Sequence, residues 1–180
     1  MPSPAVSTNS SRKLLRRFRR SRRGSVAVEF ALVAPVFFAL LFAIIETAIV
    51  FFADQVLESI TQNSARMILT GQAQTAAYTQ AQFKTYVCGQ IPALFNCNNV
   101  YVDVESYPAF TNVNINSQID GAGNFVNNMQ YNPGGPGDIV VVRLFYQWQL
   151  YVTGLGYNIS NLAGSKRLLT ATAAFRNEPY

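Results

Sequence analysis

The longest apolar stretch of the chain covers residues 30–53. Glu46 is its only charged residue, and Thr47 adds modest polarity. A membrane-spanning helix needs about 20 apolar residues, so this stretch is long enough to cross a bilayer. A secretory signal peptide would have a shorter apolar core followed by a small-x-small cleavage site, and no such site follows cleanly here. The pattern therefore predicts a helix that stays in the membrane as an anchor.

The same helix is predicted to continue beyond the membrane. Residues 54–70 become polar but keep apolar positions at helical spacing, and Gly71 is a suitable C-cap. A continuous helix over residues 25–70 would be about 69 Å long at 1.5 Å per residue. Its outer half would need to pack against its own ectodomain, against other copies, or both. The expected packing stripe is Val56, Leu57, Ile60, Ser64, Met67 and Ile68.

Residues 72–180 predict a small domain with a second helix and an antiparallel sheet that packs on the long helix. In the first strand, alternating valines face inward and leave Asp103 and Glu105 on the other face, interpreted as solubilising surface charges. Residues 108–137 are rich in Asn, Gly and Pro and predict a long loop, with a short strand near residues 113–115. The predicted helix covers residues 78–88, and the strands cover residues 98–106, 139–152 and 166–176.

The basic charge is concentrated at the N-terminus. The net charge is +5, but eight of the fourteen basic residues lie within residues 1–24, which leaves six basic and nine acidic residues, a net charge of −3, in the rest. A positive flank before an apolar helix keeps that end in the cytoplasm. A nucleic-acid-binding surface would instead spread basic and aromatic residues over a folded face, and we expect no nucleic-acid partner.

Two cysteines, Cys88 and Cys97, lie on the far side of the predicted span, where disulfides persist. A bridge between them would close a small loop and contribute about 2–3 kcal/mol. Two free thiols in the core are the alternative.

The sequence offers little for catalysis or for a cofactor. The chain has no histidine, so it has neither a Ser-His or Cys-His nucleophile system nor histidine ligands for a metal. Residues 120–124 faintly suggest a calcium loop but lack further carboxylates, so a Gly/Asn turn is the favoured interpretation. We expect a non-enzymatic protein without a metal or cofactor.

A basic leader, Gly24, the small residue Ser25, Glu29 five residues after the glycine, and then an apolar run resemble a class III, type IV pilin-like signal. Together with the stretch Ala-Val-Glu-Phe-Ala-Leu-Val-Ala-Pro at 27–35, Ile-Ile-Glu at 44–46, the cysteine region and the C-terminal strand, this is similar to the TadE-like family, the minor pilins or pseudopilins of Tad/Flp pilus machines. The resemblance implies an α+β fold, with a long N-terminal transmembrane helix that extends into a small pilin-like ectodomain with a short antiparallel sheet. It divides the chain into a basic cytoplasmic leader at 1–24, a transmembrane and extended helix at 25–71 and a periplasmic ectodomain at 72–180.

The resemblance also implies roles for residues at the start of the helix. A prepilin peptidase would cut between Gly24 and Ser25 on the cytoplasmic side of the inner membrane and leave the helix attached. The new ammonium of Ser25 could meet the Glu29 carboxylate on its own helix or on a neighbour's, and pilin resemblance implies the neighbour. The alternative is that Glu29 only reaches the cytoplasmic headgroups.

Glu46 is the second acidic residue of the apolar stretch, about 100° around the helix from Glu29. A deep carboxylate costs about 2.5–3.5 kcal/mol on insertion scales, which favours a polar partner on another helix. A position near the outer interface is the alternative.

The sequence thus predicts a single-pass pseudopilin of the bacterial inner membrane that acts in Tad/Flp pilus assembly, adherence or related secretion. Its partners would be prepilin peptidase, other Tad pilins, the inner-membrane assembly platform and the lipid bilayer. The competing hypothesis is a membrane-anchored adhesion module that uses the loop at 108–137 to bind an external partner and does not polymerise.

Overall fold

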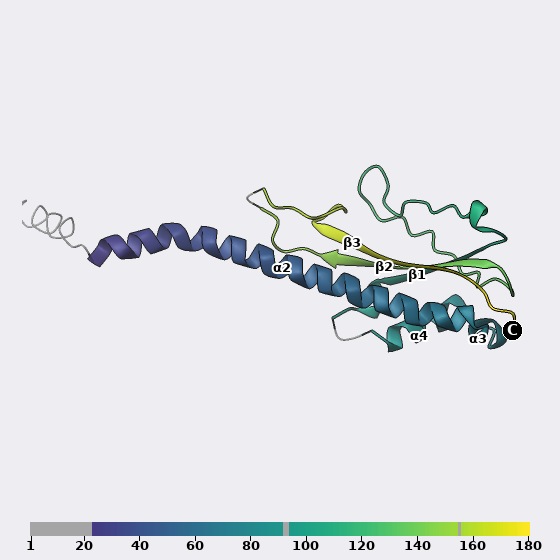
Figure 1. The fold of residues 1–180 in the computed structure, drawn as a ribbon. Helices are drawn as coiled ribbons and strands as arrows, with labels where there is room; N and C mark the ends of the chain where they lie inside the picture. Colours follow the sequence, from purple (N-terminus) through teal and green to yellow (C-terminus); the bar gives the residue numbers. More distant parts are fainter. Residues whose placement is uncertain (1–22, 92–93, 155) are drawn as a thin grey trace, which may run out of the picture. The chain divides into compact units, whose positions relative to one another are not determined.

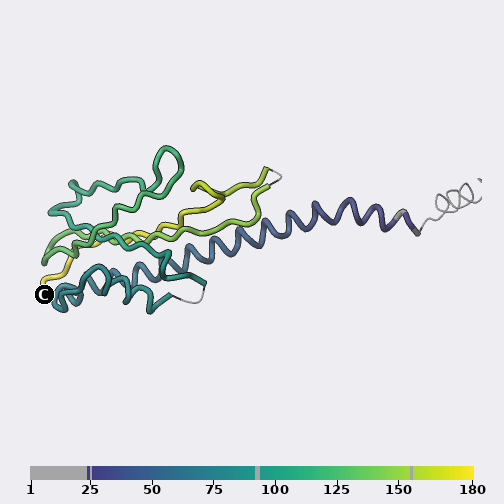
Figure 2. Tube along the Cα trace, turned by 180° about the vertical axis from the view of Figure 1, so that it is seen from behind, coloured from purple at the N-terminus to yellow at the C-terminus, as the bar shows by residue number. Residues whose placement is uncertain are grey.

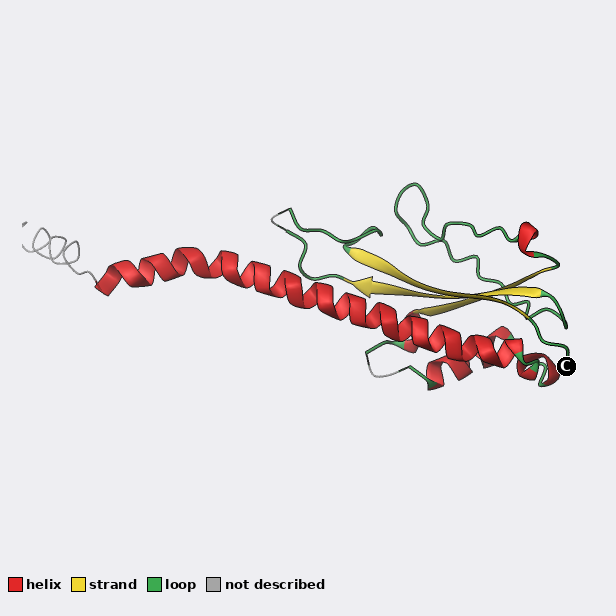
Figure 3. Ribbon diagram, viewed as in Figure 1, coloured by secondary structure: helices red, strands yellow, loops and turns green. Residues whose placement is uncertain are grey.

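A computed structural model of the chain describes residues 23–91, 94–154 and 156–180. The basic leader, apart from its last two residues, lies outside the described residues. The chain forms two compact units, residues 1–44 and residues 45–180, and the long helix α2, Arg23–Leu69, begins in the first and ends in the second. The fold is mixed α+β, with one long apolar helix followed by a three-stranded antiparallel sheet (Figure 3), as the sequence predicts.

Helix α2 ends where Gly71 adopts a left-handed backbone conformation with φ of 73°. The Gly71 amide donates to the Ile68 carbonyl at 3.0 Å, which satisfies one of the carbonyls left over at a helix C-terminus. The ring of Tyr180, the last residue of the sequence, occupies the space that a Cβ at position 71 would need, at 2.2 Å. Both the backbone conformation and the close ring therefore require glycine here.

Two short helices follow, α3, Gln72–Thr75, and α4, Gln80–Gly89. Helix α4 starts at a capping box, in which the Thr79 side chain accepts from the Gln82 amide and the Gln82 side chain accepts from the Thr79 amide. The structure starts α4 two residues later than predicted and adds α3, which was not predicted.

The sheet has the order β1-β2-β3, with β1 at Val100–Tyr107, β2 at Ile139–Gln149 and β3 at Lys166–Arg176. All neighbours are antiparallel; Val102 pairs with Leu144, and Leu144 pairs with Ala171. The third strand has the predicted bounds, while the second ends three residues earlier than expected. The predicted strand near 113–115 is wrong, because only a short 3-10 turn, Phe110–Asn112, forms in that part of the loop.

One face of the sheet packs on residues of α2 and α4 to form the main core (Figure 1). Of the predicted stripe on α2, Leu57 and Ile68 are fully buried, as is the hydroxyl-bearing Ser64. Burial of about 25 cal/mol per Å² of apolar surface makes this contact the main source of stability. The strands contribute Val100, Val102, Val104, Val140, Val142, Leu144, Leu169, Ala171 and Ala173 to the same core.

The long loop at 108–137 crosses the opposite face of the sheet, as the views from two sides agree (Figures 1 and 2). There Phe145 and Leu168 are buried in a second apolar cluster, against which Phe125 of the loop packs. Segment 130–132 also runs beside β1: the Val104 amide donates to the Gln130 carbonyl at 3.0 Å, and the Asn132 amide donates to the Val104 carbonyl at 2.8 Å. The sheet is therefore covered on both faces, and β2 is buried along most of its length.

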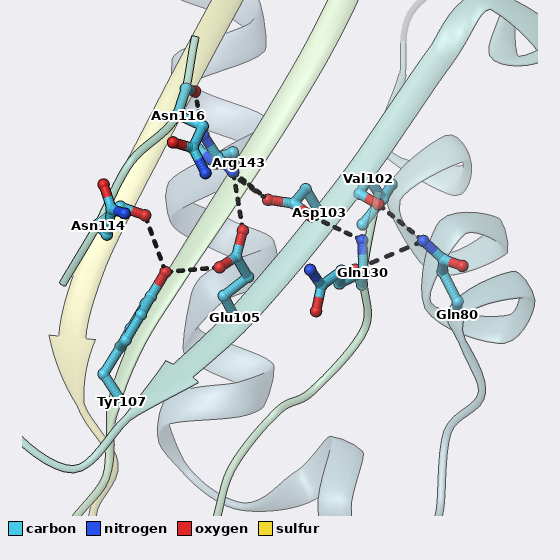
Figure 4. A network of polar contacts seen from close by, with 9 residues as sticks. All are labelled: Gln80, Val102, Asp103, Glu105, Tyr107, Asn114, Asn116, Gln130 and Arg143. Carbon is cyan, nitrogen blue, oxygen red and sulfur yellow. Dashed lines mark hydrogen bonds and ion pairs between the residues drawn. The ribbon is translucent and has the colours of Figure 1, made fainter. Parts of the chain in front are cut away.

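The interpretation of Asp103 as a solvent-facing charge is wrong. Its side chain is 1% exposed and bonds the Arg143 guanidinium at 2.7 Å and 3.0 Å (Figure 4). The same guanidinium contacts Glu105, whose side chain keeps 24% of its exposure, at 2.9 Å. The outer face of β1 is polar, as predicted, but the loop covers it, and the two carboxylates form an internal ion-pair network.

We predict that Arg143→Met lowers the free energy of unfolding by about 3–5 kcal/mol, because it leaves Asp103 buried without its counter-charge. Arg176→Met is the matched control: Arg176 is exposed and donates only to the Gly137 carbonyl, so its loss should cost less than about 1 kcal/mol. Thermal unfolding of the full chain in detergent, followed by near-ultraviolet circular dichroism, measures both. Equal effects of the two substitutions would contradict a structural role for the buried pair.

Candidate functional site

The N-terminal half of α2 exposes apolar side chains all round the helix. Phe30, Leu32 and Leu40 are 68%, 71% and 62% exposed, and most of their apolar neighbours in this half are exposed as well. A helix that is apolar on every side requires an apolar surrounding. Within the described residues, α2 is the one helix long and apolar enough to cross a membrane. The chain thus carries a single-pass membrane anchor.

The predicted processing residues lie in the first turns of this helix. Helix α2 begins at Arg23, so the bond between Gly24 and Ser25 lies in its first turn. A Cβ at Gly24 would meet nothing within 4 Å, so nothing described covers this side of the backbone. Glu29 lies one turn after Ser25 and is exposed. The structure therefore presents Gly24 and Glu29 on an accessible helical end.

Glu46 is buried, and its carboxyl group is held by the segment that follows β2. The Tyr151 amide donates to Oε1 at 2.6 Å, and the Val152 amide donates to Oε1 at 3.2 Å and to Oε2 at 3.1 Å. The donors are the backbone amides of the two residues that follow β2 and the buried Leu150. The polar partner of Glu46 thus comes from the same chain, a possibility that the sequence analysis did not consider.

A second contact joins the same two segments. The hydroxyl groups of Thr47 and Tyr157 are hydrogen-bonded to each other. This hydrogen bond and those of Glu46 attach the connection between β2 and β3, described at residues 150–154 and 156–165, to one turn of α2. We call this set of contacts the Glu46 clamp: Glu46, Thr47, Tyr151, Val152 and Tyr157.

The predicted disulfide between Cys88 and Cys97 is present. Their Cα atoms are 5.7 Å apart, a normal separation for a bridge. Cys88 lies in the last turn of α4, and Cys97 opens the short 3-10 helix that leads into β1. The bridge therefore joins α4 to the start of the sheet next to the buried side chains of Val87 and Val100.

The ion-pair network anchors the long loop at three points (Figure 4). The Gln130 amide donates to Asp103 Oδ1 at 2.7 Å, and Arg143 Nη1 donates to the Asn116 carbonyl at 3.1 Å. Tyr107, whose pKa is raised by partial burial and by its hydrogen bond to Glu105, donates to the Asn114 carbonyl at 3.1 Å. Much of the loop is thus engaged with its own sheet, which leaves less of it for an external ligand.

The turn at residues 120–124 uses its carboxylate internally. Asp120 Oδ1 accepts from the amides of Ala122 and Asn124 at 2.9 Å and 2.7 Å. These hydrogen bonds, with that from Asn124 as the largest cause, hold the pKa of Asp120 below its usual value. The described residues contain no group of three or more His, Cys, Asp or Glu side chains that could hold a metal ion.

Residues 24–66 match the protein family described as TadE-like protein. This segment is TadE-like. The match begins at Gly24, next to the predicted cleavage point, and includes Glu29 and Glu46. No curated protein and no solved structure gives a significant match to the chain.

The TadE-like segment points to a protein associated with the Tad pilus. This segment ends at Arg66, three residues before the end of α2, so the family match covers the anchor and the helical surface that packs on the sheet. The sheet and the long loop lie outside it. The family match is therefore confined to the helix, and the segment after β2, which lies outside the match, contributes the amides that bind Glu46.

Sequence reasoning identified Glu46 as a residue in need of a partner but could not find one made of backbone amides, because such donors leave no sequence signal. It also missed the pairing of Asp103 with Arg143. That pairing had a signal: the two residues lie on polar faces of adjacent predicted strands, where opposite charges commonly pair.

We predict that Glu46→Ala speeds hydrogen exchange at the amides of Tyr151 and Val152 by about fivefold or more, since each lost hydrogen bond contributes about 1 kcal/mol. Glu58→Ala is the control, because Glu58 accepts only from Gln62 on its own helix. Hydrogen exchange with mass spectrometry of the full chain in detergent measures both. Unchanged exchange at these two amides in Glu46→Ala would contradict the hydrogen bonds of the Glu46 clamp.

We also predict that neither cysteine of the native chain reacts with a maleimide until reductant is added. The double substitution Cys88→Ser with Cys97→Ser should lower the free energy of unfolding by about 2–3 kcal/mol in the chain-entropy view. Thiol labelling of the unfolded chain without reductant is the decisive measurement, and any labelling there would contradict the bridge.

Proposed function

We propose that this chain is a pseudopilin of the Tad pilus, cut by a prepilin peptidase between Gly24 and Ser25 and retained by α2 in the inner membrane. The observation that carries the proposal is the TadE-like match, which starts at the glycine that separates the basic leader from the apolar helix. The leader sets the orientation, with the N-terminus in the cytoplasm and residues 72–180 in the periplasm. The disulfide agrees with an oxidising compartment on that side.

Local structure supports the proposed cut. A peptidase binds its substrate backbone in extended form, so the first turn of α2 has to unwind around Gly24. The first four amides of a helix have no partner within it, and glycine costs about 1 kcal/mol relative to alanine in a helix. Both effects lower the free-energy cost of unwinding α2 at this end.

Cleavage would create a charge that Glu29 can recognise. The α-ammonium of Ser25 has a reference pKa near 8, so it is mostly protonated at neutral pH. Residues four apart lie on the same side of a helix, which places Glu29 one turn from the new terminus. On a neighbouring copy or another Tad pilin, the same carboxylate can set the vertical register between two helices in the assembly platform.

The function would be structural. The mature protein would pack its helix among other Tad pilins and take part in pilus assembly, in adherence or in related secretion. A free-standing adhesion module is less well supported, because Arg143, Asp103 and Tyr107 hold much of the loop at 108–137 against the sheet.

The expected mature chain starts at Ser25 and carries a net charge of −3. Intact mass of the protein from host cells tests this, and a strain without active prepilin peptidase should retain all 24 leader residues. Gly24→Leu should block the cut, and Ser25→Ala, which keeps a small residue, should not. A retained leader in cells with an active peptidase would refute the proposal.

Glu29→Ala should leave membrane insertion intact, since the helix becomes more apolar, but should reduce recovery in sheared pilus fractions about tenfold, as for an interaction of about 1.4 kcal/mol. Glu58→Ala, at an acidic position in the outer part of the same helix, is the control. Recovery equal to that of the unaltered protein would reduce Glu29 to a residue that only reaches the headgroups.

A further inference from the structure

The Glu46 clamp fixes where the hydrocarbon layer has to end. Backbone amides and carbonyls that are not paired within the protein cannot lie in lipid, so an irregular loop does not enter the hydrocarbon core. Residues 150–154 and 156–165 form such a loop, and the clamp holds its Tyr151, Val152 and Tyr157 beside Glu46 and Thr47. In Figure 1 the described part of this connection projects beyond the end of β2 and the start of β3. The hydrocarbon must therefore end before Glu46.

The length of the helix before the clamp agrees with this limit. Counted along α2, 20 residues separate Ser25 from Glu46, and all of them except Glu29 are uncharged. At 1.5 Å per residue they span about 30 Å, which is the usual thickness of the hydrocarbon core. The window at 30–53, chosen on hydropathy alone, would instead draw the clamp and the polar loop into lipid.

The chemistry of the loop fits the next layer of the bilayer. Tyr151 is 85% exposed although its amide is held by Glu46. Tyrosine side chains favour the headgroup level, where the apolar ring contacts lipid and the hydroxyl group contacts water. No acidic residue occurs between Asp138 and Glu178, while Lys166 and Arg167 open β3 directly after the loop. Asp54 of α2 offsets part of the Arg167 charge, and the remaining positive charge of this surface is attracted to anionic lipids.

We propose that residues 150–154 and 156–165 are a membrane-contacting surface that rests on anionic lipid headgroups, so that the hydrocarbon layer ends at Glu46 and not at Ala53. Tyr151 is the aromatic anchor, Lys166 and Arg167 supply the positive charge, and the Glu46 clamp holds the loop at this depth. Ile49, Phe51 and Phe52, which are 42%, 66% and 62% exposed, then lie outside the hydrocarbon.

The inference rests on membrane anchoring and not on leader cleavage or pilus assembly. The two are therefore separable by experiment. If the chain is cut before Ser25 but its Phe52 lies in lipid, the proposed function stands and this inference is wrong. A chain that keeps its leader but exposes Phe52 to water would do the reverse.

Single-cysteine variants of the full chain in vesicles of phosphatidylethanolamine and phosphatidylglycerol test the boundary, because the native cysteines are bonded to each other. Ile44→Cys and Phe52→Cys form a matched pair, as their native side chains are 67% and 62% exposed on the same helix. At a low ratio of protein to lipid, a water-soluble maleimide should label Phe52→Cys at least about tenfold faster than Ile44→Cys. Equal protection of both positions would overturn the boundary.

A fluorophore on Tyr151→Cys tests the lipid contact, with Thr111→Cys, an exposed position of the long loop, as the control. A spin label on the lipid headgroup should quench the first and leave the second unchanged. Replacing phosphatidylglycerol with phosphatidylcholine, or introducing Lys166→Gln with Arg167→Gln, should reduce the quenching. Absence of quenching at position 151 in the anionic vesicles, with the disulfide intact as evidence of folding, would overturn the contact.

Discussion

Helix α2 has to be stable both in lipid and outside it, and the rest of the structure depends on how its side chains meet that constraint. Apart from its ends and Pro35, which has no amide hydrogen, its backbone amides and carbonyls pair within the helix, so mainly the side chains need to change between lipid and water. They do change at Glu46. Before it, apolar side chains are exposed on all sides; after it, one face is buried by the sheet at Val50, Ala53 and Leu57.

This constraint explains why an acidic residue can occupy an apolar stretch. A carboxyl group in hydrocarbon is costly, whereas one that accepts hydrogen bonds from two backbone amides at the edge of a folded domain is a normal capping group. Glu46 therefore belongs to the ectodomain as much as to the anchor. The segment that matches the TadE-like model, residues 24–66, includes Glu46 and continues into the part of α2 that packs on the sheet.

The periodic parts of the fold could be predicted from the sequence because their signal is local. Helical spacing located the face of α2 that carries Leu57 and Ile68, and alternation located the inward side of each strand. The α+β class followed from the same patterns, whereas the disulfide was favoured because both cysteines lie beyond the predicted span. The conformational preference of glycine also favoured the turn at Gly71, because glycine adopts a positive φ without steric cost.

The rest depended on contacts between distant segments. Alternation showed that Asp103 and Arg143 lie on the face away from α2, but a loop of Asn, Gly and Pro gave no sign that it would cover that face. The acceptors and donors it uses are mostly backbone groups of Asn114, Asn116 and Gln130, which every residue type possesses. For the same reason the partners of Glu46 could not be read from side-chain chemistry.

The end of the chain has a consequence for the order in which the protein can fold. The Glu178 amide donates to the Leu69 carbonyl at 3.0 Å, and the ring of Tyr180 covers Gly71, so residues far from α2 in sequence complete its C-terminus. Contacts this distant in sequence form late. The apolar face of α2 therefore stays partly uncovered until β3 and residues 177–180 have packed, so folding of this domain depends on segments that are distant in sequence.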